Sequence, residues 1–263
     1  MDLELNNKVI LISGGAKGIG EAIAINVAME GGIPVIIDPS NKEGAALLGI
    51  LEGLGKKGLF ICKRLDDPMK SYEVILEVID TYGAIYGVVN NAGKNDGVGL
   101  EHGSPRMFNK SVLSNLSHYY ELAHYALPHL KASKGSIVNI SSKTAITGQG
   151  NTSGYAAAKG AQLALTREWA VELTKYNIRV NAVVPAEVNT PQYQKWINSL
   201  ANPDHKLKEI EDRIPLNKRM TTPEEIASMV VFLLSNKASH ITGQQMFVDG
   251  GYSHLDRALN SLV

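Results

Sequence analysis

Short apolar runs and longer segments of helical periodicity alternate along the whole chain. Runs rich in Val, Ile and Leu predict strands at 8–13, 33–38, 58–62, 85–90, 135–140, 178–184 and 245–248. Apolar residues spaced three and four apart predict helices at 18–30, 42–54, 69–82, 106–131, 153–176, 191–200 and 223–235. Buried strands that alternate with helices are typical of a parallel sheet covered on both faces. The pattern therefore predicts an α/β fold, a doubly wound parallel sheet of about seven strands with helices on both faces.

Nothing in the sequence divides the chain into parts. Its 263 residues suffice for one sizeable core, and it shows no internal repeat, low-complexity segment or Gly/Ser linker. We therefore expect a single domain, 1–263. The least regular stretch is 186–222, which is rich in charge and carries Tyr193 and Trp196. It follows a predicted strand at the edge where doubly wound sheets bind ligands, so we expect it to form a substrate lid.

Composition and charge argue against several function classes. Lys plus Arg and Asp plus Glu both number 26, which gives no reason to expect nucleic acid or a membrane surface as a partner. Cys62 is the single cysteine, so no internal disulfide is possible and a reducing cytoplasm is the expected location. The chain shows no signal-peptide pattern and no apolar run of 18 residues. His118 and His124 are six apart, off a common helix face, and we predict no metal site.

A glycine-rich segment, SGGAKGIG at Ser13–Gly20, lies between the first predicted strand and the first predicted helix. Glycines there permit a tight turn and a close approach of the backbone to a pyrophosphate, which then rests on the positive end of the helix. The next strand ends in Asp38, at about the distance from the loop at which an acidic residue reaches the adenosine ribose. The arrangement predicts a dinucleotide site.

Tyr155 and Lys159 are four residues apart in GYAAAKG, so on a helix they share a face. A phenol ordinarily ionises near pH ~10. A neighbouring ammonium favours the phenolate, which would make Tyr155 a usable acid and base. Taken alone, the pair is also compatible with an exposed helix face. The glycine-rich segment upstream is what favours chemistry.

The motifs together resemble the short-chain dehydrogenase/reductase family. They are SGGAKGIG, Asn90-Asn91-Ala92-Gly93, Asn115, Ser142, the Tyr155/Lys159 pair and Pro185–Thr190, and the resemblance runs from about Lys8 to Tyr252. It implies a Rossmann-type subunit and an NAD(P)-dependent oxidoreductase. The departures are minor: Ser13 stands for a threonine, Ala186 for a glycine, and Arg64 where an adenine-contacting aspartate is common.

The resemblance also implies a catalytic tetrad of Asn115, Ser142, Tyr155 and Lys159. Tyr155 would be the acid and base, and Lys159 would lower its pKa, hold the nicotinamide ribose and pass the proton on. Ser142 would bond the reacting oxygen. Asn115 would help to hold a water that connects Lys159 with solvent, although a polar residue that caps or kinks its helix is the structural alternative.

Cofactor contacts follow from the same resemblance. Asn91 and Thr190 each have a structural alternative, a turn after a strand and a helix N-cap before Pro191. The cofactor-binding residues implied are Gly14, Lys17, Gly18, Ile19, Gly20, Asp38, Leu65, Asn91, Ala92, Gly93, Ile140, Tyr155, Lys159, Pro185, Val188 and Thr190.

Asp38 favours NAD, whereas Lys17 favours NADP. Asp38 would oppose a 2′-phosphate ~4 Å away by roughly 4 kcal/mol at an effective dielectric near 20. A basic residue such as Lys17 often accompanies NADP, but here it is also compatible with a solvated side chain. We predict NAD, with NADP possible.

The substrate prediction also combines resemblance and chemistry. The stretches 141–173, 185–197 and 247–259 resemble aldose dehydrogenases of the family, bacterial L-fucose dehydrogenase among them. A sugar suits the polar residues expected near the site, and Trp196 would lie against a pyranose face or simply pack in the lid. The predicted substrate contacts are Asn95, Ser142, Lys143, Gln149, Tyr155, Glu187 and Trp196.

Two rival classes stay open. One is another carbonyl reductase, such as a 3-oxoacyl carrier-protein reductase or a polyol dehydrogenase. The other is a non-catalytic nucleotide sensor, which would have no need of Tyr155 and Lys159 together. The resemblance further implies a homotetramer formed through 106–131, 153–176 and the C-terminal strand. The segment Tyr252–Arg257 would complete a pocket, in its own or a neighbouring subunit, or serve only as an interface tail.

Overall fold

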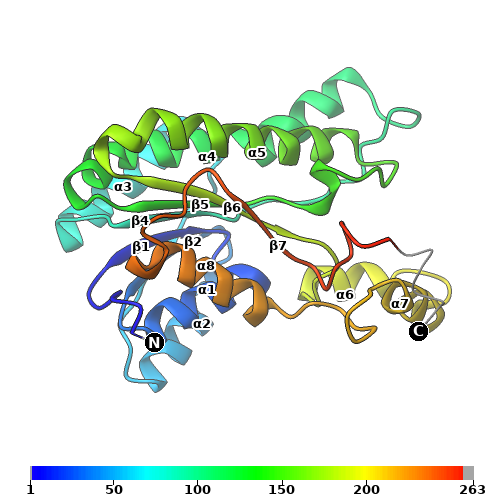
Figure 1. Ribbon diagram of the computed structural model, residues 1–263, viewed down its shortest axis with the longest axis horizontal. Helices are drawn as coiled ribbons and strands as arrows, with labels where there is room; N and C mark the ends of the chain where they lie inside the picture. Colours follow the sequence, from blue (N-terminus) through cyan, green and yellow to red (C-terminus); the bar gives the residue numbers. More distant parts are fainter. Residues whose placement is uncertain (1, 257–263) are drawn as a thin grey trace.

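The computed structural model describes residues 2–256 and shows one seven-stranded parallel sheet, in the order β3-β2-β1-β4-β5-β6-β7 (Figure 1). The order reverses between β1 and β4, which is the switch point where doubly wound sheets bind ligands. The strands are β1 (Val9–Ser13), β2 (Ile33–Asp38), β3 (Leu59–Cys62), β4 (Gly87–Asn90), β5 (Ser136–Ile140), β6 (Arg179–Pro185) and β7 (Gln245–Val248).

Helices cover both faces of the sheet. In Figure 1, α3, α4 and α5 lie above the sheet and α1, α2 and α8 below it, while α6 and α7 project to one side. The helices are α1 (Gly18–Met29), α2 (Asn41–Gly53), α3 (Pro68–Tyr82), α4 (Pro105–Ser133), α5 (Ser153–Leu173), α6 (Pro191–Ile197), α7 (Pro203–Asp212) and α8 (Pro223–Leu234).

Alternation along the strands produces the two halves of the core. Ile10 and Ile12 of β1 pack with α1, α2 and α8, whereas Val9 and Leu11 pack with α3, α4 and α5. Successive strand side chains point to opposite faces, so a strand that is apolar at every position is buried on both. The predicted single-domain, doubly wound fold is confirmed.

The predicted elements match the structure closely except after β6. The helix predicted at 191–200 ends at Ile197, and α7 was not predicted. None of the residues of α7 is buried, and Leu207 and Ile210 are its only two aliphatic side chains, too few to identify a helical period from sequence. The helix predicted at 153–176 ends at Leu173, and a short 3₁₀ turn completes it.

The segment 186–222, the proposed lid, leaves the sheet and returns to nearly the same place. The Thr221 amide donates to the Glu187 carbonyl at 2.9 Å, and the Asn189 amide donates to the Thr221 carbonyl at 2.9 Å. These bonds fix the two ends of the segment beside each other, while α6 and α7 lie between them. Both ends are therefore anchored at the carboxyl edge of β6.

Candidate functional site

The loop between β1 and α1 is shaped by close backbone contacts. Gly14 has φ +61°, and a Cβ there would lie 2.9 Å from the Cα of Ala92. A Cβ on Gly20 would lie 2.1 Å from the carbonyl oxygen of Gly14. Only glycine fits these positions. The resulting turn leads directly into α1, whose N-cap, Lys17, makes no side-chain capping bond, so the first amides of the helix are available to an anion.

Asn91 and Ser13 join this loop to the end of β4. Asn91 Nδ2 donates to the carbonyls of Ser13 and Gly14, both at 3.0 Å. Ser13 Oγ accepts the amides of Asn91 at 3.0 Å and Ala92 at 3.1 Å. The structure therefore gives Asn91 the turn role considered from sequence, and the hydroxyl of Ser13 makes these contacts without the methyl group of a threonine.

Asp38 and Lys17 lie on the side of the loop where β2 ends. Asp38 Oδ1 accepts the Ser40 amide at 2.9 Å. Lys17 Nζ lies 2.6 Å from Glu43 Oε1, so the cation predicted to favour a phosphate already has a carboxylate partner on α2. The Asp38 carboxylate has no such cationic partner among residues 2–256, and its second oxygen remains an acceptor for hydroxyl groups.

Lys159 is buried and points at the end of β5. Its Nζ donates to the Ile140 carbonyl at 2.7 Å and to the Tyr119 hydroxyl at 3.2 Å. It lies 5.5 Å from the centroid of the Tyr155 ring. Burial lowers the pKa of Lys159 to about 7, because a charge is costly where water is excluded. The two residues predicted to share a helix face thus do so.

The pKa of the Tyr155 hydroxyl differs from the sequence prediction. Burial raises the pKa of Tyr155 to about 12, and the hydrogen bond with Ser142 lowers it by less. The pKa shift is opposite to the one predicted from the neighbouring lysine, because desolvation outweighs the effect of an ammonium that is turned toward β5.

Ser142 and Asn115 have contacts of different kinds. Ser142 Oγ accepts the Thr144 amide at 3.3 Å, which caps a short 3₁₀ turn at Lys143–Ala145. Asn115 Oδ1 accepts the Lys94 amide at 2.7 Å, and its carbonyl accepts Gln162 Nε2 at 2.8 Å. Asn115 therefore has the structural role considered from sequence, and its contact with a water stays a prediction.

A second buried lysine, Lys143, forms the other wall of the site. Lys143 forms a salt bridge with Glu187, and both side chains are buried. The Tyr193 hydroxyl donates to Glu187 Oε2 at 2.7 Å. Lys143 Nζ lies 4.2 Å from the centroid of the Tyr252 ring. Burial, followed by the charge of Glu187, raises the pKa of Tyr193, so this phenol stays a hydrogen-bond donor. We call Lys143, Glu187, Tyr193 and Tyr252 the polar wall.

The polar wall and the tetrad lie at one edge of the sheet. β5 and β6 pair in parallel, with Ile140 beside Val183, so Ser142 and Lys143 follow one strand where Glu187 follows the other. Trp196 packs edge-on against Tyr193 at 5.2 Å and keeps 46% of its surface exposed. Trp196 therefore packs against the lid, and its contact with a pyranose face stays a prediction.

The other predicted site residues lie on exposed loops, at a helix end or in the core. Asn95 and Gln149 are exposed on loops, and Asn95 Oδ1 accepts the Gly97 amide of its own turn at 3.2 Å. Thr190 caps α6 by accepting the Tyr193 amide at 3.2 Å, and its methyl would lie 3.3 Å from a Cβ on Gly18. Leu65 packs at the edge of the core, and Val188 is buried. Of the C-terminal segment Tyr252–Arg257, the last residue lies outside the described residues.

Sequence reasoning missed Tyr119 and Gln162. Tyr119 lies one turn after Asn115 on α4, and Gln162 lies three residues after Lys159 on α5. Both are completely buried. The spacing i to i+3 or i+4 from a predicted site residue on a helix was the available signal.

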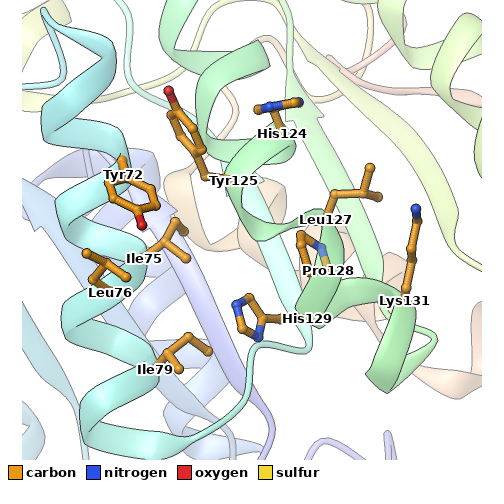
Figure 2. A pocket seen from close by; sticks show the side chains of 10 residues that line it. All are labelled: Tyr72, Ile75, Leu76, Ile79, His124, Tyr125, Leu127, Pro128, His129 and Lys131. Atoms are coloured by element: carbon orange, nitrogen blue, oxygen red, sulfur yellow. The ribbon is translucent and has the colours of Figure 1, made fainter.

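An apolar hollow on the outside of the molecule is separate from all of these residues. It lies between α3 and α4, with a volume of about 470 Å³, and Figure 2 shows aliphatic and aromatic side chains of both helices turned toward it. No predicted site residue lines it. Within residues 2–256, no group of three His, Cys, Asp or Glu could hold a metal ion, and no helix is long and apolar enough to cross a membrane.

Comparison with known proteins finds close relatives over nearly the whole chain. The family model described as enoyl-(acyl carrier protein) reductase matches residues 14–253. The chain is 36% identical to the 3-oxoacyl-[acyl-carrier-protein] reductase FabG of Thermotoga maritima, over 95% of this chain and 99% of that one. It is 34% identical to the L-fucose dehydrogenase of Rattus norvegicus, over 94% of this chain and 89% of that one.

Solved structures agree with the sequence relatives. The crystal structure of Cj0485 dehydrogenase is 48% identical, with a TM-score of 0.94 and 99% of both chains covered. The ligand-free aldohexose dehydrogenase AldT of Thermoplasma acidophilum is 32% identical, with a TM-score of 0.88 and 98% of both chains covered.

Proposed function

Because this chain belongs to the short-chain dehydrogenase/reductase family, whose members are NAD(P)-dependent oxidoreductases, we propose that it is an NAD-dependent aldose dehydrogenase. The substrate proposed is an aldopyranose, L-fucose or a sugar of like configuration, which is oxidised at C1 to the lactone. The observation that carries the proposal is the polar wall, a buried ion pair with a phenol donor beside Ser142.

The dinucleotide fits the loop after β1. Gly14 and Gly20 allow a turn in which any Cβ would collide with Ala92 or with the Gly14 carbonyl, and this tight turn leads into the uncapped amides of α1, against which a pyrophosphate would bind. Asp38 would bind the adenosine ribose hydroxyls, and Asn91, Ala92, Gly93, Val188 and Thr190 would lie along the remainder of the cofactor. When bound, its nicotinamide supplies the hydride acceptor.

NAD rather than NADP is favoured by two contacts. Asp38 opposes a 2′-phosphate by charge. Lys17, which would attract that phosphate, is paired with Glu43 at 2.6 Å. An exposed pair is weak, so it holds Lys17 only in part. The carboxylate of Asp38 is therefore the main determinant proposed here.

The protein groups handle the proton of the reaction. Oxidation removes a hydride from C1 and a proton from the anomeric hydroxyl, and Tyr155 is the base that takes the proton. A phenol whose pKa is about 12 holds its proton at neutral pH, so a nearby positive charge has to stabilise the phenolate. Lys159, buried 5.5 Å from the ring centroid, is the cation of this chain placed to do so. Ser142 bonds the reacting oxygen.

The polar wall suits hydroxyl groups better than an acyl chain. Each carboxylate oxygen of Glu187 has one protein partner and a further lone pair, and Lys143 has N–H groups beyond the one given to Glu187. A sugar hydroxyl can bond to these. An acyl chain would remove water from the ion pair and offer no hydrogen bonds in return, which is costly. Trp196 offers an apolar face to the ring carbons.

The relatives support the same class without deciding it. An L-fucose dehydrogenase and an aldohexose dehydrogenase are similar over almost their whole length, but so is a 3-oxoacyl carrier-protein reductase. The polar wall is the feature on which we prefer the sugar.

The test is NADH formation across a substrate panel. Purified enzyme would be assayed with L-fucose, its epimers and deoxy analogues, with polyols, and with 3-hydroxyacyl thioesters. We expect an aldose to give the highest kcat/KM, and analogues that lack one bonded hydroxyl to lose at least tenfold. Rapid turnover of a thioester or polyol with no aldose activity would contradict the substrate, and no turnover at all would favour a nucleotide sensor.

The proposal includes a homotetramer in the cytoplasm. Leu113 on α4 and Val171 on α5 are exposed apolar side chains on neighbouring helices, which would be buried between subunits. Light scattering would give a mass near four subunits, and a monomer would contradict this part. The segment 186–222 is proposed as the lid, since its ends are tied together beside Glu187.

A further inference from the structure

We propose that Tyr119 is a positioning residue of this site, whose hydroxyl fixes the Lys159 ammonium against the carbonyl of Ile140. The inference rests on the role of Lys159 in the proposed function but not on the identity of the substrate. Nothing in the tetrad of Asn115, Ser142, Tyr155 and Lys159 requires a second tyrosine.

The three groups form a closed triangle of contacts. The Tyr119 hydroxyl donates to the Ile140 carbonyl at 3.0 Å and accepts from Lys159 Nζ, which lies 3.2 Å away. Lys159 Nζ donates to the same carbonyl at 2.7 Å. Ile140 is the last residue of β5, so its carbonyl is held by the strand. The hydroxyl thus attaches the lysine to β5, a strand whose residues are all buried.

The ammonium lies between two tyrosines of different exposure. Lys159 Nζ is 5.5 Å from the ring centroid of Tyr119 and 5.5 Å from that of Tyr155. Tyr119 is completely buried, whereas Tyr155 is only half-buried and faces the site. Two N–H groups of Lys159 are used by the carbonyl and by Tyr119, and the third remains for a ligand.

Packing alone does not account for the hydroxyl. A buried phenol has to satisfy its polar atom, and a phenylalanine would fill nearly the same volume without that requirement. Burial raises the pKa of Tyr119 well above its ordinary value, so the phenol stays neutral. It therefore holds the ammonium without cancelling its charge, as a carboxylate in this place would.

The groups that face Lys159 are Tyr155 on α5 and Tyr119 and His118 on α4. Burial and then the charge of Lys159 lower the pKa of His118 to about 4, so this imidazole is neutral near pH 7. Within residues 2–256, the ammonium makes no ion pair with a carboxylate. Its stabilisation depends on the carbonyl and the phenol, and loss of the phenol should make Lys159 release its proton at lower pH.

The experiment compares Tyr119→Phe with Tyr120→Phe, a matched control in which the next tyrosine of α4, 55% exposed, loses its hydroxyl. NADH and NADPH binding would be titrated by fluorescence from pH 5 to 10, together with KM for the cofactor and for the substrate that the panel identifies. We expect Tyr119→Phe to weaken cofactor binding about three- to tenfold at neutral pH. The pH at which cofactor affinity falls on the alkaline side should decrease by about one unit, because one pKa unit corresponds in free energy to about one hydrogen bond to a charged group. Substrate KM should change less than twofold.

If Tyr119→Phe and Tyr120→Phe bind the cofactor equally well and lose affinity at the same alkaline pH, the inference is overturned and Tyr119 is a packing residue. If Tyr119→Phe does not fold, 3-fluorotyrosine at position 119 keeps the ring and weakens the hydroxyl as an acceptor. A decrease in the pH at which affinity falls then supports the inference, and an unchanged pH overturns it. Failure of the sugar panel alone leaves this test intact, whereas a wild type that binds neither nucleotide overturns both proposals.

Discussion

Lys143 and Lys159 are two buried lysines at the same edge of the sheet, and their surroundings differ. Lys143 forms an ion pair with Glu187, whereas the hydrogen-bond partners of Lys159 among residues 2–256 are a carbonyl and a phenol. Burial therefore lowers the pKa of Lys159 to about 7, within reach of physiological pH. A paired lysine presents a fixed charge that suits recognition, and an unpaired one can change its charge, which suits chemistry.

The elements that hold Lys159 also differ from those that hold the partners of Lys143. Lys159 is held by α5, by α4 through Tyr119 and by the end of β5. Glu187 and Tyr193 belong to the segment between β6 and α8, the proposed lid. The proposed chemistry is thus built on two helices and a strand that pack together, and the proposed specificity on the segment that leaves the sheet.

The largest effect is expected for Tyr155→Phe, which leaves both lysines in place and removes only the acid and base. We expect kcat to fall by about 10³ or more, with NADH affinity within about threefold of the wild type. Steady-state kinetics and fluorescence titration measure the two. Substantial residual kcat would remove Tyr155 from the proposed mechanism.

Replacing each lysine by alanine should separate their roles. Lys159→Ala is expected to lose about 100-fold in kcat and to bind NAD more weakly, since the lysine serves both the phenol and the ribose. Lys143→Ala should instead raise KM for the sugar about tenfold at nearly unchanged KM for NAD. If both variants show the same changes in kcat and in the two KM values, the two lysines do not have separate roles.

The ion pair of the polar wall predicts non-additive effects. Glu187→Ala leaves Lys143 buried without a partner and should destabilise the fold by about 3–5 kcal/mol as well as raise KM for the sugar. The double variant Lys143→Met with Glu187→Leu should recover most of that stability but not the sugar affinity. Trp196→Ala should raise KM for the sugar by a smaller factor. Thermal unfolding measures the stability of the three variants, and steady-state kinetics measures their KM for the sugar. A KM equal to that of the wild type in all three would contradict a role of the polar wall and Trp196 in sugar recognition.

Stability against pH tests the charge of Lys159. Its folded pKa lies below the unfolded value of ~10.4, so the unfolded chain binds more protons between about pH 7 and 10 and stability should rise with pH across that window. Lys159→Met removes this cost, and we expect it to be more stable than the wild type by about 1–3 kcal/mol at pH 6, a difference that shrinks as pH rises toward 10. Denaturant melts at three pH values measure it. A constant difference would mean that Lys159 is charged throughout.

The smallest effects concern Lys17, a third lysine, exposed and paired at 2.6 Å with Glu43. Asp38→Ala should narrow the preference for NAD over NADP by about tenfold, because a hydroxyl partner and a repulsive charge are lost together. Glu43→Gln should favour NADP by only about two- to threefold, since an exposed pair contributes little. Wild-type preference for NADP would show that Lys17 outweighs Asp38.

The one-turn spacing of Tyr155 and Lys159 could be read from the residues themselves. Asn91 and Glu187 were predicted through the family resemblance, and the structure places them just after β4 and β6. The partners of those residues could not be predicted in the same way. That Lys143 meets Glu187, and that Tyr119 reaches Lys159, depends on contacts between segments 44 and 40 residues apart in sequence. The polar helix α7 also escaped prediction, because it buries no residue.

The sequence by itself determined the doubly wound sheet, the glycine-rich loop between β1 and α1, and the one-turn spacing of Tyr155 and Lys159. Apolar period, glycine positions and one helical turn are local properties, and each is legible in a short stretch of chain. Only the tertiary structure decided the charge states. Whether a buried lysine is paired, and whether burial or a neighbouring cation prevails at Tyr155, depends on desolvation and on groups that distant segments bring together.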